Sequence, residues 1–404
     1  MTGEKHQSGV WLLVVLGALL AFASISTDLY LPAMPAMAES LGAPQSLLEF
    51  TVSGYLIGFS LGQLFWGPAS DRFGRRIPVA LGVLVFTIGS AGCALAASVE
   101  AVIAWRVVQA LGASAGVVIA RAMVRDLYGR DQAARVLSTL MTVMAAAPML
   151  GPSVGAQILW LAGWEAIFWT LAGFGVLTLA ALATVAETLP HARRGAGGFA
   201  DALRAYGVLL ENRRLLGYAA AGGFFYAGIF AYVAGTPFAF IDYHGLSPQL
   251  FGLIFATGVI GMIAGNTVNG RLVVRLGSDS LLRAGAMLAL AAGGWSAVAA
   301  ATGLGGAFGL AAGLFVYVSA NGLIIANVVS GALESAPARI GAASALVGAI
   351  QYGSGVLGSG LVGALADGTP LPLGLAMLLA GAGTLASVLF GLGLKPQAPS
   401  STTS

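Results

Sequence analysis

Apolar runs of about twenty residues alternate along the whole chain with short polar segments. This run length matches a bilayer, because a membrane helix needs about 20 mostly apolar residues to cross the hydrocarbon core. The run after Lys5 is too long for a signal peptide, and we expect it to be retained. The pattern predicts twelve membrane-spanning helices, at residues 10–32, 46–67, 77–97, 100–121, 136–159, 164–186, 214–240, 248–270, 281–301, 304–327, 340–362 and 371–394.

Basic residues in the polar segments predict the orientation. Of the 19 Lys and Arg residues, 18 fall before the first span, after the last, or in every second loop, and Arg106 lies inside a span. Loops rich in Lys and Arg stay on the cytoplasmic side. We therefore predict that both termini are cytoplasmic, which also explains the net charge of +3 without a nucleic-acid partner.

The longest polar segment, residues 187–213, separates six spans from six. We predict an N-terminal bundle over 1–190, a cytoplasmic linker over 191–213 and a C-terminal bundle over 214–404. Within the linker we expect a short amphipathic helix at 199–210, on the membrane surface. Gly67, Arg72 and Gly74 recur as Gly270, Arg275 and Gly277, which favours two related halves.

Composition excludes several classes of protein. Hydrophobic residues make up 58% of the chain and charged residues only 9%, against about 25% charged in soluble domains. Soluble enzymes and disordered proteins fit poorly. Cys93 is the single cysteine, and three dispersed histidines (His6, His191 and His244) make a metal site implausible. We expect no cofactor.

Asp28 and Arg106 are the two charged residues well inside predicted spans. Charged groups at such depth usually face a cavity or a partner and mark functional sites. Their similar depths allow an ion pair or a shared aqueous cavity. Proton-driven transport needs a group that binds and releases a proton, and Asp28 is the candidate, with Arg106 modulating it. The alternative is that the two charges neutralise each other and only fix helix packing.

The loop after the second span reads GPASDRFGRR. Its glycines suit a helix end and a tight turn, and an acid stands among three arginines. An anchor of positive charge would explain the arginines but not the acid. We predict a conformational role for Gly67, Asp71, Arg72, Gly74, Arg75 and Arg76, with Asp71 pairing with nearby arginines or with a helix N-terminus.

The fifth span contains APMLGPSVGA. Its prolines, Pro148 and Pro152, remove helix hydrogen bonds, and Gly151 and Gly155 permit close helix contact. A kink that serves only packing is the alternative reading.

Polar and aromatic residues in other spans are further candidates for a substrate cavity. Tyr317 and Asn321 lie four residues apart in the tenth span, and Tyr226 and Tyr232 belong to an aromatic group in the seventh. These aromatic residues suit either an apolar pocket or contact with lipid. Tyr30 and Gln109, close in sequence to Asp28 and Arg106, complete the set.

Together these motifs resemble the major facilitator superfamily, and more narrowly its drug:proton antiporters of the Bcr/CflA (bicyclomycin/chloramphenicol resistance) branch. The resemblance rests on GPASDRFGRR, on RVVQALG from Arg106, on LGPSVGA and on STDLYLPAMP from Ser26, and it covers essentially the whole chain. ARAMVRDLYGR from Ala120 and the segment from Glu165 to Pro190 add to it. Two positions depart from the pattern, Ala156 in the fifth-span motif and Val274 in the second-half copy of the loop.

The resemblance implies an all-α fold of two six-helix bundles around a central cavity lined by the first, fourth, seventh and tenth spans. It further implies a monomeric, multi-pass protein of the bacterial inner membrane that exports lipophilic drug-like molecules in exchange for protons. A metabolite permease on the same fold is the main alternative. A membrane enzyme or a sensor is a weaker one, because no span groups catalytic residues and no soluble domain of any size occurs.

Overall fold

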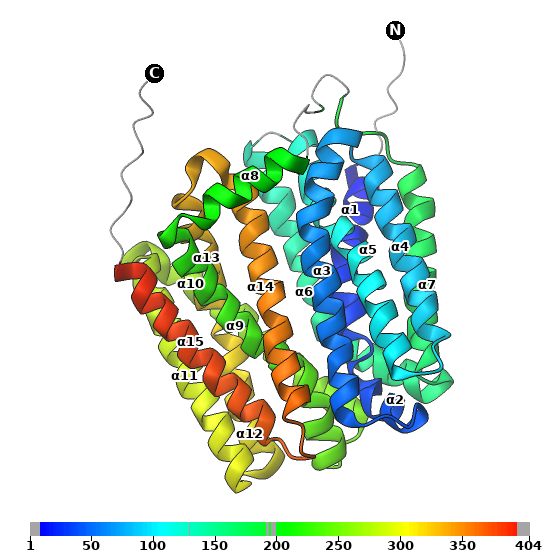
Figure 1. Cartoon of the computed structure of the whole chain (residues 1–404), viewed down its shortest axis with the longest axis vertical. Coiled ribbons are helices and arrows are strands. Elements are labelled where there is room, and N and C mark those ends of the chain that lie inside the picture. Colours follow the sequence, from blue (N-terminus) through cyan, green and yellow to red (C-terminus); the bar gives the residue numbers. More distant parts are fainter. Residues whose placement is uncertain (1–8, 129, 191–193, 195–198, 394–404) are drawn as a thin grey trace.

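The computed structural model describes residues 9–128, 130–190, 194 and 199–393. Helices traverse the molecule side by side in two bundles, the first blue to teal and the second green to red in Figure 1. The described part of the chain is helical throughout its regular structure, without strands. This confirms the predicted two-bundle, all-α fold.

The first bundle contains seven α-helices and a short 3-10 turn, η1. Their bounds are α1 Gly9–Asp28, η1 Leu31–Ala33, α2 Met34–Ser40, α3 Gln45–Phe73, α4 Arg76–Ala94, α5 Val99–Leu127, α6 Arg130–Ala162 and α7 Glu165–Ala183.

The second bundle begins after α8, which spans Phe199–Leu210 as predicted and lies across the end of the bundles (Figure 1). Its elements are α9 Arg213–Pro237, η3 Phe238–Tyr243, α10 Pro248–Leu276, α11 Ser278–Thr302, α12 Gly306–Ser319, α13 Asn321–Glu334, η4 Pro337–Arg339, α14 Ile340–Ala364 and α15 Leu371–Gly393.

Ten helical stretches among the described residues are long and apolar enough to cross a membrane. The other two predicted spans correspond to α3 and α6, which pack within the first bundle. All twelve predicted spans are therefore helical, although two are interrupted.

The first interruption follows Asp28, where α1 ends and the chain continues through η1 and α2. The prediction of a continuous helix to residue 32 was wrong here, because Pro32 and Pro35 cannot donate helix hydrogen bonds. The second interruption divides the tenth span at Ala320. There the Ala320 amide is shared between the carbonyls of Val316 and Tyr317.

Side-chain caps explain where several helices begin. The Ser98 hydroxyl accepts from the Ala101 amide at the start of α5, and Ser247 accepts from Leu250 at the start of α10. Asn212 accepts from Leu215 at the start of α9. Each cap satisfies one of the amides that a helix N-terminus leaves unpaired.

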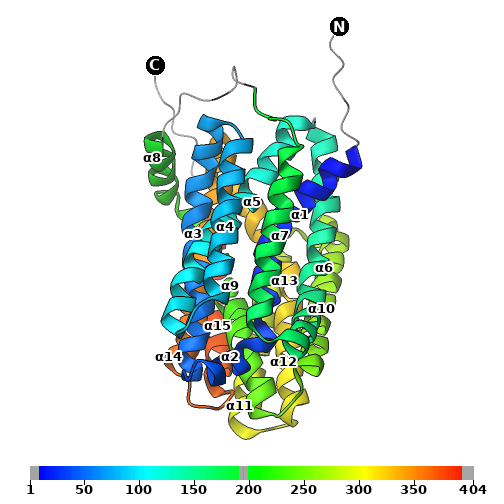
Figure 2. The same ribbon diagram turned by 90° about the vertical axis from the view of Figure 1, so that its right-hand side faces the viewer.

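The α3–α4, α5–α6 and α10–α11 turns lie at one end of the molecule, near α8, which we call the basic end (Figures 1 and 2). The opposite end contains α2 and the α14–α15 turn. Between the bundles, α3 packs on α14 and α6 on α10. At the opposite end η1 also packs on α9 and α10, and α2 packs on η3, so the bundles close on each other there.

Candidate functional site

A cavity of about 200 Å³ lies between the two bundles. Its walls are mostly apolar or aromatic, and Asp28 is the one charged residue that lines it. Eight of the described helices contribute residues to it: α1, α3, α6, α9, α10, α12, α13 and α14. The lining residues are Ala23, Ser24, Thr27, Asp28, Tyr55, Leu56, Pro148, Tyr226, Ile229, Phe230, Tyr232, Val233, Phe255, Val259, Met262, Val318, Asn321 and Tyr352.

Asp28 is the last residue of α1 and is 6% exposed. The antiporter-type motif of α6 packs directly against it. A Cβ added at Gly151 would lie 3.0 Å from the Asp28 Cβ, and one at Gly155 would overlap the Leu29 carbonyl oxygen. The glycines therefore let α6 approach the end of α1, while Pro148 lines the cavity and Pro152 is buried within α6.

Arg106 in α5 is fully buried between two tyrosine rings. Its guanidinium carbon lies 4.3 Å from the centre of the Tyr30 ring and 4.2 Å from that of Tyr55. Nη1 donates to the Ser26 carbonyl at 2.8 Å and to Gln109 Oε1 at 2.5 Å. Within the described part of the chain, Nε and Nη2 have no hydrogen-bond partner.

Asp28 and Arg106 therefore lie in the same region of the first bundle without forming a direct ion pair. The ion pairs among the described residues are Asp71–Arg75, Arg75–Asp126 and Glu187–Arg194. Arg106 bonds instead to the Ser26 carbonyl, two residues before Asp28. Asp28 therefore lines the cavity, whereas the Arg106 guanidinium is separated from the cavity by the Tyr55 ring.

The cavity predictions divide into two groups. Of the residues predicted for a substrate cavity, Tyr226, Tyr232 and Asn321 line this one. Tyr30, Gln109 and Tyr317 do not line it, because each is engaged inside its own bundle: Tyr30 and Gln109 contact Arg106, and Tyr317 stacks on Phe225 with ring centres 5.1 Å apart.

Sequence reasoning missed three residues that lie inside the molecule, Tyr55, Tyr352 and Glu49. Tyr55 and Tyr352 line the cavity, and nothing in the sequence distinguishes them from lipid-facing aromatics. Glu49 lies near the start of the predicted second span, and it is 0% exposed inside α3. The available signal in the sequence was the spacing of Gln45 and Glu49. Residues four apart on a helix lie on the same face, and the Gln45 side-chain amide donates to Glu49.

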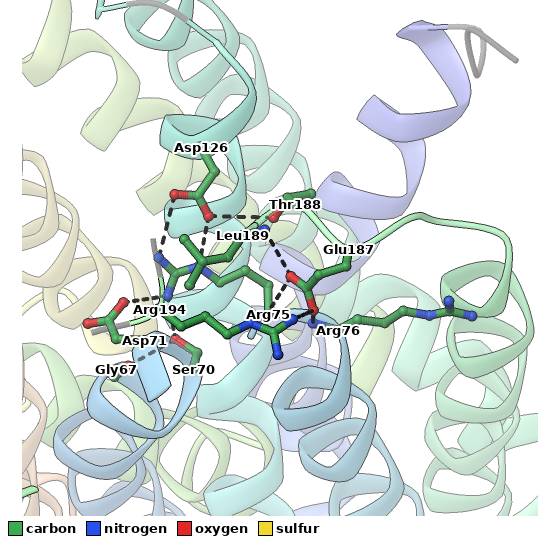
Figure 3. Close-up of polar contacts among 10 residues, drawn as sticks. All are labelled: Gly67, Ser70, Asp71, Arg75, Arg76, Asp126, Glu187, Thr188, Leu189 and Arg194. Carbon is green, nitrogen blue, oxygen red and sulfur yellow. Dashed lines mark hydrogen bonds and ion pairs between the residues drawn. The ribbon is translucent and has the colours of Figure 1, made fainter. Parts of the chain in front are cut away.

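At the basic end, Arg75 is the centre of a polar cluster (Figure 3). Its guanidinium donates to Asp71 at 2.5 Å, to Ser70 at 2.8 Å and to Asp126 of α5 at 2.8 Å. The pairing of Asp71 with an arginine thus involves Arg75. The guanidinium of Arg75 thus links Asp71 of α3 to Asp126 of α5. Arg75 itself is buried, whereas the Asp71 side chain is exposed.

Glu187, which follows α7, closes the cluster from the other side (Figure 3). Its two carboxylate oxygens accept from the backbone amides of Arg75 at 2.9 Å and Arg76 at 3.1 Å. Partial burial raises the pKa of Glu187, but these amides, that of Leu189 and the Arg194 charge outweigh it, and the net pKa lies below the usual value.

The remaining motif residues shape the turn between α3 and α4. Gly74 ends α3 with φ of +89°, a conformation that side chains rarely adopt. Gly67 accepts from the Ser70 hydroxyl through its carbonyl, and Arg76 donates to the Ala183 carbonyl. Arg72 lies over the Phe73 ring.

The second bundle repeats this turn with different chemistry. Like α3, α10 has 29 residues and ends at a glycine of positive φ, Gly277 at +77°. Val274 is 88% exposed where the first bundle has its acid. Neutral groups join α10, α11 and α13 instead: Asn327 donates to Asn269 at 2.7 Å and accepts from Ser278 at 2.6 Å.

A major facilitator superfamily model matches residues 14–359. The chain belongs to the major facilitator superfamily. It is 30% identical to the bicyclomycin resistance protein homolog of Haemophilus influenzae, over 92% of this chain and 93% of that one. It is 33% identical to the chloramphenicol resistance protein of Pseudomonas aeruginosa, over 92% and 87%. These relatives confirm the resemblance to the Bcr/CflA branch.

Solved structures of the superfamily have the same fold. A crystal structure of a D-xylose-proton symporter superposes with a TM-score of 0.77 at 19% identity, covering 95% of this chain and 96% of that one. In this chain the cavity lies between the two bundles. Groups of three His, Cys, Asp or Glu suited to a metal are absent among the described residues.

Proposed function

We propose that this chain is a drug exporter of the bacterial inner membrane that exchanges lipophilic, drug-like molecules for protons by alternating access. Drug efflux agrees with the names of its relatives, which include bicyclomycin, chloramphenicol and multidrug resistance proteins. The observation that carries the proposal is the cavity itself, in which one acid faces walls of tyrosine, phenylalanine and aliphatic side chains.

The cavity walls suit molecules that bind by burying apolar surface rather than by forming hydrogen bonds. Six aromatic residues line the cavity, and each buries a large apolar surface against a ligand. A cationic drug would pair with Asp28, and a neutral drug would displace the water around it. Pairing with a cationic drug favours release of the proton from Asp28. Loss of water alone favours the protonated form, so with a neutral drug the release of the proton would depend on the approach of Arg106.

Arg106 supplies the complementary influence. Burial favours the neutral form of a carboxyl group, whereas a nearby guanidinium favours the carboxylate. Since Nε and Nη2 of Arg106 are unpaired in the described structure, a modest movement of α5 relative to α1 lets them bond to Asp28. Movement of Arg106 towards and away from Asp28 would then alternate proton release and uptake.

The Arg75 cluster would set the conformational equilibrium at the cytoplasmic end. It ties α3, α5 and the segment after α7 into one rigid unit. Such a unit moves as a body when the bundles rock about the cavity. The proposed orientation, with the basic end in the cytoplasm, follows from the distribution of arginines.

A metabolite permease is the second candidate. The similarity of fold to a D-xylose-proton symporter favours it only at the level of architecture. Against it, the polar groups lining the cavity are few: Ser24, Thr27, Asn321 and the tyrosine hydroxyls accompany Asp28.

The deciding experiment measures accumulation of chloramphenicol and of a lipophilic cation in cells that lack their own efflux pumps. Expression should lower accumulation of at least one compound, and an uncoupler of the proton gradient should restore it. Lower accumulation that persists with the uncoupler would reject proton coupling, and increased accumulation would favour uptake.

Orientation is tested separately by cysteine labelling in a Cys93→Ala background. Gly207, exposed on α8, and Pro44, exposed at the opposite end, are the positions to compare. A membrane-impermeant thiol reagent added to intact cells should label Pro44→Cys and spare Gly207→Cys. The reverse result would invert the proposed topology.

A further inference from the structure

Glu49 is a buried acid that the mechanism above does not use. It lies in the first two turns of α3, at the end of the molecule opposite the arginines, and its side chain is 0% exposed. Oε1 accepts from the Gln45 side-chain amide at 2.7 Å. Oε2 has no hydrogen-bond partner among the described residues.

Glu49 lies where the two bundles meet. Residues 46–63 of α3 and 348–363 of α14 form an interface that we call the α3–α14 seam. Along it, Ser60 donates to the Ala349 carbonyl at 2.9 Å and Ser53 bonds to Ser359 at 2.7 Å. At its outer end a Cβ added at Gly363 would lie 3.0 Å from the Ser46 carbonyl and 3.4 Å from the Glu49 Cβ.

The Ser53–Ser359 bond and the approach of Gly363 hold the two helices close together near Glu49, whose side chain is 0% exposed. An ionised carboxylate in such a place needs a counter-charge, because burying an unpaired charge is strongly unfavourable. None of the ion pairs among the described residues includes Glu49.

The ionisable groups of the surrounding elements do not supply that charge. Arg106 of α5 is engaged with Ser26, Gln109 and the two tyrosine rings. At the outer end of α2, α5, α9 with η3, and α14, the ionisable side chains are Glu39, Glu100, Asp242, Tyr243, His244 and Asp367. Apart from His244, which lies against Phe240 and Tyr243, none of these is basic. Deeper in the bundle lie Asp28, Tyr30 and Tyr55.

We propose that Glu49 is a second proton site, which holds its proton while the outer end of the α3–α14 seam is closed and loses it to the external solution when the seam opens there. The O–H bond of the carboxylic acid breaks as water reaches Oε2, and a proton from outside re-forms it before the helices can close. The inference rests on the proposed antiport, since it gives the external proton a place to bind before Asp28.

If Glu49 is such a site, opening of the outer end of the α3–α14 seam depends on the external pH even without a drug. At low pH the neutral acid permits the closed seam, whereas at high pH the carboxylate favours the open one. Asp28 lies at the cavity rather than in the seam, so its replacement should leave this response in place.

The test measures the distance between spin labels at Pro44→Cys and Leu365→Cys, which flank the outer end of the seam, in Cys93→Ala protein in liposomes. Raising the pH from 5 to 9 should increase the fraction of long distances in the parent protein. Glu49→Gln should abolish this dependence, and Glu49→Asp should retain it. Glu39→Gln, which alters an exposed acid at the same end, is the matched control and should respond like the parent.

A pH response that survives in Glu49→Gln, or its absence from the parent, would overturn the proposal. If the Gln variant does not fold, Glu49→Met supplies the neutral side chain. Loss of the response in Asp28→Asn with retention in Glu49→Gln would assign it to the cavity acid and also overturn the proposal. The labels report without any drug, so a failure of drug export alone would count against the proposed function and not against this site.

Discussion

The guanidinium of Arg106 stacks on the Tyr55 ring at 4.2 Å, and Tyr55 itself forms part of the cavity wall. The Tyr55 hydroxyl bonds to that of Ser26 at 2.6 Å, and the Ser26 carbonyl accepts from Arg106. One aromatic side chain thus separates a buried cation from the space in which a ligand would bind. A ligand that moves Tyr55 also disturbs the contacts that hold Arg106.

Replacing Arg106 tests this arrangement. Arg106→Lys keeps the charge but loses the planar stacking and the forked donors, and we expect gradient-driven efflux to fall about tenfold, equivalent to about 1.4 kcal/mol in the barrier. Arg106→Ala should abolish efflux and lower the thermal unfolding temperature, since it removes both ring contacts. Efflux from proteoliposomes and unfolding in detergent measure the two effects. Wild-type efflux by Arg106→Ala would remove Arg106 from the mechanism.

Asp28→Asn should reduce efflux driven by a pH gradient to the level of protein-free liposomes. Drug binding should persist at reduced affinity, because the apolar and aromatic walls remain. Glu39→Gln, at an exposed acid, is the control and should transport normally. Retained gradient-driven efflux in Asp28→Asn would move the proton site elsewhere.

Asp71→Asn and Asp126→Asn separate conformational from structural roles around Arg75. The exposed Asp71 side chain should contribute only about 0–1 kcal/mol to the free energy of unfolding. Asp126, at 17% side-chain exposure, should contribute more. We expect Asp71→Asn to fold normally, transport less and show faster labelling of cysteines placed between the bundles at the basic end. Full transport at normal abundance would reduce Asp71 to an anchor.

Glu187 predicts a pH dependence of stability. Its pKa is below its usual value of 4.5 in the folded protein, so its contribution is fully present above about pH 4.5 and is lost as the pH falls through the folded pKa. Glu187→Gln should therefore lower the unfolding temperature at pH 7, and the difference from the parent should shrink below pH 4.5. A constant difference across this range would show that the ionised carboxylate is not what matters.

Gly155→Ala tests the contact between α6 and the end of α1. The added methyl group overlaps the Leu29 carbonyl, and overpacking of this kind costs about 1–3 kcal/mol. Gly173→Ala is the matched control, because a Cβ there meets nothing within 4 Å. We expect a lower unfolding temperature and weaker transport only for Gly155→Ala. Equal behaviour of the two variants would contradict the close approach.

The helices and the α3–α4 turn could be predicted from the sequence because their signals are local. The apolar runs predict the spans, and Gly74 predicts the turn between α3 and α4. The break at Ala320 is not local. It lies where Gly265 of α10 meets the Ser319 carbonyl and Gly322 of α13 meets the Asn266 amide of α10, so closely that a Cβ at either glycine would overlap backbone atoms. The pattern of residues along a single helix does not reveal a contact between two helices.

The candidate site was predictable in depth but not in direction. Counting residues placed Asp28 and Arg106 at similar heights, yet the rotation of α5 points Arg106 towards Tyr30 and Tyr55. Glu49 was missed for the same reason. Its distance from the helix start suggested exposure, whereas the face it occupies is the one that α14 covers.

The end of α1 at Asp28 also has an electrical consequence. The last carbonyl groups of a helix together carry about half a negative charge, and here they lie beside the cavity rather than in water. Arg106 neutralises this helix terminus by donating to the Ser26 carbonyl. In the proposed cycle, Arg106 would exchange the Ser26 carbonyl for the Asp28 carboxylate, and the terminal carbonyl groups would lose that hydrogen bond. The region around Asp28 therefore stays attractive to positive charge through the backbone as well as through the carboxylate.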